Sequence, residues 1–356
     1  MLKKHTYFVL ISALVFFQSC GDHSQVTLPV SVGKLGSLIV VGDLSIHNSL
    51  KSTVDSVFLK PLPHLPAGEP FFELLKPDAQ DFQRFYYNQK SVFVLVDEGS
   101  LNAMENLLEP FSSETINDLI NNKEPKLMSK RNLFARYQHI VYLFGKDAKD
   151  LQRKLRLCQA QLNNALMSYE LEDQNLKLFK DTSANDKYFK VIKEELGLGV
   201  KIPDRFDLKY HKNNTFWFQY DAIENDVPKT IALVMHTYPY KDTSDFTYES
   251  IRTARDTVMK YLIKGEVPGT YMGTTESEFY PPIFQETINL NSMYCSKIRG
   301  WWTIRGLSMA GPFVRYVVHI PNTNTLFAFE GFVYKPNLNT KERDLRLIEA
   351  IALSIK

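Results

Sequence analysis

The 356-residue chain is 44% hydrophobic and 13% aromatic, so it can bury the core of one large or two ordinary domains, and general disorder is excluded. The formal net charge is +2, and removal of residues 1–19 takes away Lys3 and Lys4 but no acids, which leaves a nearly neutral mature chain. This balance argues against a nucleic-acid partner, which would require a strongly basic face.

The first twenty residues have the pattern of a secretory signal. Lys3 and Lys4 form a positive segment, residues 7–17 form an apolar run too short for a stable membrane span, and the small Ser19 precedes Cys20. Residues 15–21 resemble a bacterial lipobox, which implies that the Cys20 thiol takes a diacylglycerol and becomes the mature N-terminus. An ordinary signal peptide with an incidental cysteine, or an uncleaved anchor, is the alternative.

The rest of the chain divides into a tether and two halves. Residues 20–35 follow the 1–19 signal peptide without helical periodicity and are typical of a tether that keeps the folded part near its membrane. We expect an N-terminal α/β half at 36–198 and a C-terminal α+β half at 199–356. The predicted class is α+β, with mixed or antiparallel sheets covered by helices and two α/β-like halves packed into one unit.

In the N-terminal half, short apolar runs alternate with helical periods. The predicted strands are 38–41, 71–75, 92–96 and 137–144, and the predicted helices are 45–58, 79–87, 188–196 and a long helix from Asp147 to about residue 179. Residues 61–70 contain four prolines, which predict a stiff connector, with a proline-rich docking site as the alternative.

Strand signals dominate the C-terminal half. The predicted strands are 206–209, 215–220, 231–235, 286–290, 312–320 and 326–334, with a helix at 247–264. Residues 269–275 are rich in Gly and Thr and are predicted to form a loop. A closing helix follows Asn339, and Glu342, three residues on, predicts a capping box.

Two cysteines remain if Cys20 is lipidated. Cys158 lies on the apolar stripe of the long helix and Cys295 in a strand-like run, so both are expected to be buried as small hydrophobic side chains. A Cys158–Cys295 disulfide in an oxidising envelope is the open alternative.

No local motif for catalysis or metal binding is present. The eight histidines form no close pair on a helix or strand, and His139, His236 and His319 fall in predicted strands as structural residues. Residues 306–311 resemble a nucleophile elbow around Ser308, but the second glycine is misplaced and no helix follows. We therefore predict no catalytic residue, no metal and no cofactor.

The densest candidate for ligand or partner binding is segment 299–316. Its aromatic and basic residues are Trp301, Trp302, Arg299, Arg305 and Arg315. Neighbouring strand residues point to opposite faces, so one tryptophan is expected in the core and the other exposed, where it can stack on a sugar or anchor a protein. The structural alternative is a core tryptophan with arginines at the sheet surface, one of them paired with Glu330.

The same segment carries a family resemblance. Residues 299–302, 311–314 and 330–336 resemble a family of Gram-negative envelope lipoproteins, domain of unknown function 4837 (DUF4837). The resemblance extends from Gly33 to the terminal helix. It implies a lipid-acceptor cysteine and one domain filling the protein, and it brings no established activity or catalytic residues.

These observations predict an envelope lipoprotein held to a membrane through Cys20 and facing the periplasm. Its expected role is a non-catalytic interaction or assembly factor with an envelope protein partner. A glycan or small-ligand binding protein at the face of Trp301, Trp302 and Arg305 is the first alternative. A hydrolase whose residues meet only in three dimensions is the second.

Overall fold

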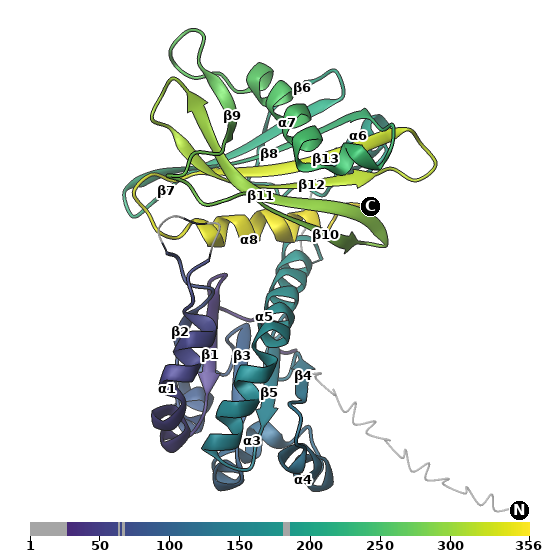
Figure 1. The fold of residues 1–356 in the computed structure, drawn as a ribbon. Helices are drawn as coiled ribbons and strands as arrows, with labels where there is room; N and C mark the ends of the chain where they lie inside the picture. The colour runs from purple at the N-terminus through teal and green to yellow at the C-terminus, as the bar shows by residue number, and fades with distance from the viewer. Residues whose placement is uncertain (1–26, 63–64, 66–67, 181–185) are drawn as a thin grey trace, which may run out of the picture.

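The structure, a computed structural model, describes residues 27–180 and 186–356, apart from 63–64 and 66–67. The predicted lipobox and Cys20 lie outside the described residues. Figure 1 shows a smaller sheet in the N-terminal half, a larger curled sheet in the C-terminal half, and helix α8 between them. The predicted α+β class with two halves is confirmed.

The N-terminal sheet has the order β2-β1-β3-β5-β4 and is parallel except for β4. Its strands are β1 (Ser37–Val41), β2 (Glu73–Leu75), β3 (Ser91–Val96), β4 (Leu127–Arg131) and β5 (His139–Phe144). Strands β3 and β5 are buried along their whole length because helices cover both faces of the sheet. This explains why both read as continuous apolar runs in the sequence.

Two long helices cover one face of this sheet and short ones cover the other. The long ones are α1 (Leu44–Phe58) and α5 (Ala148–Phe179). The short ones are α2 (Ala79–Asp81), η1 (Phe82–Tyr86), η2 (Glu98–Ser100), η3 (Asn102–Met104), α3 (Glu105–Leu108) and α4 (Ser113–Asn121). Asp147 caps α5 by accepting from the Asp150 N–H at 2.8 Å, and the predicted apolar stripe of α5 is buried.

The C-terminal sheet is antiparallel, with the order β10-β11-β12-β13-β8-β7-β6 and with β9 paired to β11. Its strands are β6 (Asp207–Lys212), β7 (Thr215–Glu224), β8 (Val227–Pro239), β9 (Tyr271–Thr275), β10 (Phe284–Leu290), β11 (Met293–Arg305), β12 (Ala310–His319) and β13 (Thr325–Tyr334). Strand β9 corrects the loop predicted at 269–275, because pairing with β11 outweighs the low strand propensity of its Gly.

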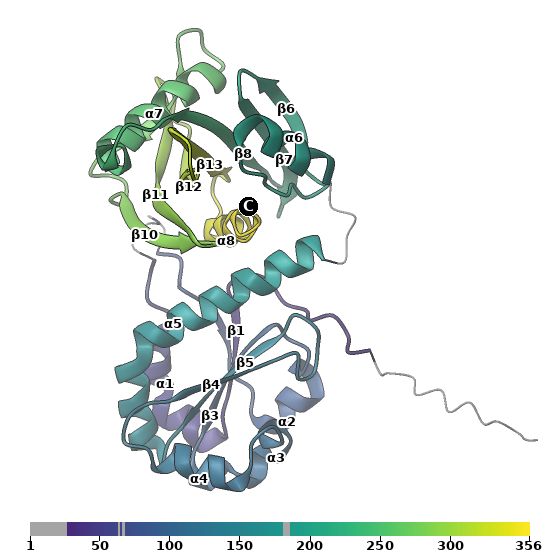
Figure 2. The same cartoon turned by 90° about the vertical axis from the view of Figure 1, so that its right-hand side faces the viewer.

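Helices cover both faces of the C-terminal sheet as well. Helices α6 (Asp186–Leu196) and α8 (Lys341–Ala352) pack on one face, and α7 (Tyr248–Leu262), preceded by η4 (Thr243–Phe246), packs on the other (Figure 2). Helix α6, which the sequence places in the N-terminal half, therefore shares the core of the C-terminal sheet. Helix α8 approaches the sheet closely at Gly331, where a Cβ would lie 2.2 Å from Ile348 Cγ2.

Helix α8 also joins the two halves through its N-terminus. The capping box predicted at Asn339 and Glu342 is wrong, because the N-cap is Thr340 and its side chain makes no cap hydrogen bond. Instead, the Glu69 carboxylate accepts from the N–H groups of Lys341 at 3.1 Å and Glu342 at 2.9 Å. A residue from the N-terminal half thus satisfies the free amides of a helix that packs on the C-terminal sheet.

The proline-rich segment is part of the same junction. Pro61 and Pro70 form an antiparallel bridge, and the Leu62 N–H donates to the Glu69 carbonyl at 2.9 Å. Leu62 and Leu65 are buried in the core of the C-terminal half. The segment predicted as a connector or docking site therefore docks on the other half of its own chain. None of the helices within the described ranges is long and apolar enough to cross a bilayer.

Candidate functional site

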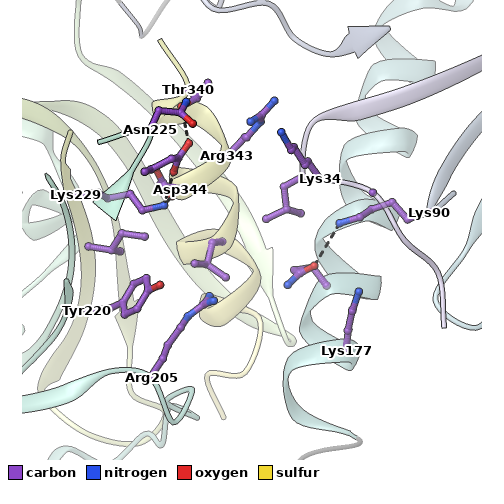
Figure 3. A pocket seen from close by; sticks show the side chains of 16 residues that line it. Lys34, Lys90, Lys177, Arg205, Tyr220, Asn225, Lys229, Thr340, Arg343 and Asp344 are labelled. Carbon is purple, nitrogen blue, oxygen red and sulfur yellow. Dashed lines mark hydrogen bonds and ion pairs between the residues drawn. The ribbon is translucent and has the colours of Figure 1, made fainter. Parts of the chain in front are cut away.

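A cleft of about 570 Å³ lies between the two halves, where the amino ends of β1 and β3 face helix α8 and strands β7 and β8 (Figure 3). Six of its lining residues are basic and two are acidic. The basic residues are Lys34, Lys90, Lys177, Arg205, Lys229 and Arg343, and the acidic ones are Glu224 and Asp344. A cleft lined mainly by one sign of charge concentrates ions of the opposite sign.

The two carboxylates of the cleft are already engaged with ammonium groups. Lys229 Nζ lies 2.7 Å from Glu224 Oε2 and 3.1 Å from Asp344 Oδ1. Lys335 Nζ lies 3.0 Å from Glu224 Oε2 and 2.9 Å from Asp344 Oδ2. Burial opposes the ionisation of Glu224, but the two lysines outweigh it and lower its pKa to about 2. Both acidic side chains that line the cleft are thus neutralised by Lys229 and Lys335.

Four cations of the cleft have no carboxylate partner among the residues that the structure describes, namely Lys34, Lys90, Lys177 and Arg205. Lys90 is 6% exposed, and within the described structure its Nζ reaches only the amide oxygen of Gln174, at 3.5 Å. Lys177 Nζ donates to the Ser31 carbonyl at 3.2 Å. Arg343 is different, because its guanidinium pairs with Glu73.

Each cation comes from a different element, and local structure sets its position. Lys34 lies just before β1, and Lys90 directly precedes β3, where its backbone bonds to Val32 and His139. Lys177 lies in the last turn of α5. Arg205 precedes β6, and its guanidinium carbon lies 5.1 Å from the centroid of the Tyr220 ring, which orients it along the cleft wall.

The arrangement is suited to binding an anion. Ammonium and guanidinium groups from both halves can donate to a phosphate or carboxylate placed between them, and charge-assisted hydrogen bonds are the stronger kind. In the described parts of the chain, the side chains of His, Cys, Asp and Glu form no cluster of three or more that could hold a metal ion.

The site residues predicted from the sequence lie away from this cleft. Trp301 and Trp302 point to opposite faces of β11, as predicted, but the expectation that one ring is exposed is wrong, because both are buried at 4% and 2% exposure. Helices cover both faces of this sheet, so neither face presents a ring to solvent. Trp301 stacks on Tyr280 at 5.4 Å, and Trp302 packs on Phe332 at 5.7 Å.

The three predicted arginines separate in space. Arg299 donates to Glu349 at 2.9 Å, and Arg315 donates to Glu330 at 3.1 Å, which is the structural pairing that the sequence offered as an alternative. Only Arg305 is exposed, with 54% of its side chain accessible. These residues form no joint ligand face.

The remaining residues singled out from the sequence occupy structural positions. Ser308 lies on the connection between β11 and β12, with no helix after it. Cys158 and Cys295 are free and buried in different hydrophobic cores, which excludes the disulfide alternative. Among the histidines, His139 pairs with Asp173 at 3.0 Å and His236 accepts from Arg315 at 2.9 Å, both as buried structural residues.

Sequence reasoning missed the cleft because its cations come from four distant segments. The one local signal is Lys90, a lysine that directly precedes the fully buried strand β3. Lys177 and Arg205 have no neighbouring motif that would mark them.

Comparison with known protein families accounts for both halves. Residues 185–354 match the model of the domain of unknown function DUF4837. This match covers slightly less than half of the chain. Residues 31–178 match a different model, the domain of unknown function DUF8532. The resemblance to DUF4837 is thus confirmed for the C-terminal half. Its expected extension to Gly33 is wrong, because residues 31–178 match the second model. The cleft lies where the two matched regions meet.

Three solved structures match the chain at low sequence identity. The Ran-binding protein Mog1p of Saccharomyces cerevisiae is 7% identical over 45% of this chain and 89% of its own, with a TM-score of 0.29. LpqN, involved in cell envelope biogenesis of Mycobacterium tuberculosis, is 13% identical over 45% and 83%, with a TM-score of 0.26. A protein of Bacteroides thetaiotaomicron is 10% identical over 46% and 45%, with a TM-score of 0.23. No curated protein matches the chain.

Proposed function

We propose that this protein is a lipid-anchored lipoprotein of the bacterial envelope that binds a small anionic ligand, without catalysis, in the cleft between its two domains. The lipobox around Cys20 supports the anchor and the periplasmic orientation. The cleft supports the binding role. One observation carries it: Lys34, Lys90, Lys177 and Arg205 converge without a carboxylate partner within the described structure.

The physical reason is the cost of gathering like charges. Native proteins pair the charges that they bury, because a partly desolvated ammonium without a counter-ion is unfavourable. A phosphate or carboxylate between the two walls would replace repulsion among the cations with attraction. Each charge-assisted hydrogen bond contributes about 1.5–3 kcal/mol.

The test is isothermal titration calorimetry of the purified protein with inorganic phosphate and with citrate, at low and high salt. Lys177→Ser and Arg205→Ser remove one cation from each wall, and Lys51→Ser is the matched control, because Lys51 is exposed on α1 and does not line the cleft. We expect about tenfold weaker binding for each cleft variant and no change for the control. Wild-type protein that binds neither anion, or cleft variants that bind like the control, would refute the proposal.

The interaction role predicted from the sequence makes an envelope protein with an acidic segment the alternative occupant of the cleft. Cross-linking in intact cells separates the two. A stoichiometric partner joined through Lys34 or Lys177 would replace the small ligand, whereas a partner joined elsewhere would not.

A further inference from the structure

Lys90 differs from the other cations of the cleft in its burial. Lys34 and Arg205 are exposed and Lys177 is half-buried, whereas Lys90 is 6% exposed and still lines the cavity. Among the described residues its Nζ has one distant polar contact, the 3.5 Å approach to Gln174, which Figure 3 shows as a dashed line on the α5 wall. A buried amine without a counter-ion loses its proton more readily than an exposed one.

The carboxylates near Lys90 are committed to other groups. Glu170 pairs with Arg346 at 2.6 Å and accepts from the Gly36 N–H at 2.8 Å. Asp173 pairs with His139 at 3.0 Å. Neither lies within ion-pair distance of Lys90.

Burial, and not the balance of the nearby charges, sets the direction in which the pKa of Lys90 moves. Burial is the largest influence and lowers the pKa of Lys90. The nearby charges act in both directions, because Glu170 and Asp173 raise the pKa whereas Lys177 and Arg346 lower it. The net direction is downward. A desolvated lysine beside a second cation is the arrangement in which a side-chain amine is nucleophilic near neutral pH.

We propose that Lys90 is a reactive amine that condenses with the carbonyl group of an acidic aldehyde or 2-oxo acid held in the cleft. This inference rests on the proposed anion site, because the neighbouring cations Lys177 and Lys34 bind the acidic group. The neutral Nζ attacks the carbonyl carbon to form a carbinolamine. The carbonyl oxygen then leaves as water with the two amine protons, and a C=N bond joins Lys90 to the ligand.

The test is reductive trapping with pyridoxal 5′-phosphate, an aldehyde that carries a phosphate. The purified protein is exposed to a limiting amount of the aldehyde, and sodium borohydride reduces the imine to a stable secondary amine. Mass spectrometry of the peptides then locates the label. We expect Lys90 to be labelled at least about tenfold faster than the exposed Lys51, and inorganic phosphate to slow labelling at Lys90 only.

Two variants and one further probe complete the experiment. Lys90→Arg keeps a long basic side chain but cannot condense, so it should remove the fast label, whereas Lys51→Arg should not. The comparison of Lys90 with Lys51 within the wild-type protein decides the matter even where a variant fails to fold, and equal labelling of the two would overturn the proposal. Equal labelling of Lys90 by pyridoxal, which lacks the phosphate, would overturn the anion site. Phosphate binding with an unlabelled Lys90 would overturn the reactive lysine alone.

Discussion

The ion pair between Glu170 and Arg346 allows a quantitative test of how the two domains are joined. Both side chains are fully buried, Glu170 on α5 of the first domain and Arg346 on α8 of the second. The Glu170→Gln substitution keeps one side-chain oxygen, which can still accept from the Gly36 N–H. It removes the negative charge, and it also places an amide NH2 group where Arg346 Nη1 finds its acceptor, so that hydrogen bond is lost as well.

The expected cost follows from what the arginine retains. Removal of one partner from a buried pair costs about 3–5 kcal/mol, because the other charge stays buried. Arg346 keeps a second contact, Nε to Glu342 Oε1 at 3.2 Å, so we expect the lower end, about 3 kcal/mol of the free energy of unfolding. In the double variant with Arg346→Met, the loss should be smaller than the sum of the two single losses, because neither Glu170 nor Arg346 is then a buried charge that lacks its partner.

The assay is urea unfolding at neutral pH, followed by far-ultraviolet circular dichroism and by tryptophan fluorescence. The three tryptophans, Trp217, Trp301 and Trp302, all lie in the second domain, so fluorescence reports on that domain and circular dichroism on both. Glu172→Gln is the control, because its ion pair with Arg131 is exposed and should contribute less than about 1 kcal/mol. A Glu170→Gln loss no larger than that of Glu172→Gln would refute the reasoning.

Three further predictions concern the wider structure. Trp302→Ala should cost about 3–5 kcal/mol of stability yet leave phosphate binding unchanged, as measured by urea unfolding and calorimetry. Because the folded pKa of Glu224 is about 2, below its ordinary 4.5, its contribution to stability is present above pH 4.5 and is lost as the pH falls toward 2. Melting temperatures of wild-type protein and Glu224→Gln should therefore differ at pH 6 and converge by pH 2, and a gap that persists at pH 2 would contradict this assignment. Burial raises the pKa of Cys158 to about 11 and of Cys295 to about 12, so a thiol reagent should react with both only after denaturation, and reaction of the native protein would contradict their burial.

Much of the fold could be predicted because the information is local. The apolar run at 38–41 reflects a strand that is buried on both faces, and the stripe on the 32-residue helix α5 reflects the helical period of 3.6. Where a long-range partner decided the outcome, local reasoning failed. Strand β9 forms because β11 is beside it, and Glu69 caps α8 from more than 270 residues away in the chain.

The candidate site belongs to this second kind. The sequence by itself determined the apolar periods, the lipobox pattern at Cys20, the near-neutral charge and the resemblance of the C-terminal half to DUF4837. It drew attention to Trp301 and Trp302 because they are conspicuous in composition, but whether a strand residue is exposed depends on what covers each face of its sheet. Only the tertiary structure could bring Lys90, Lys177 and Arg205 to one cleft, because charges that interact through space leave no periodic trace along the chain.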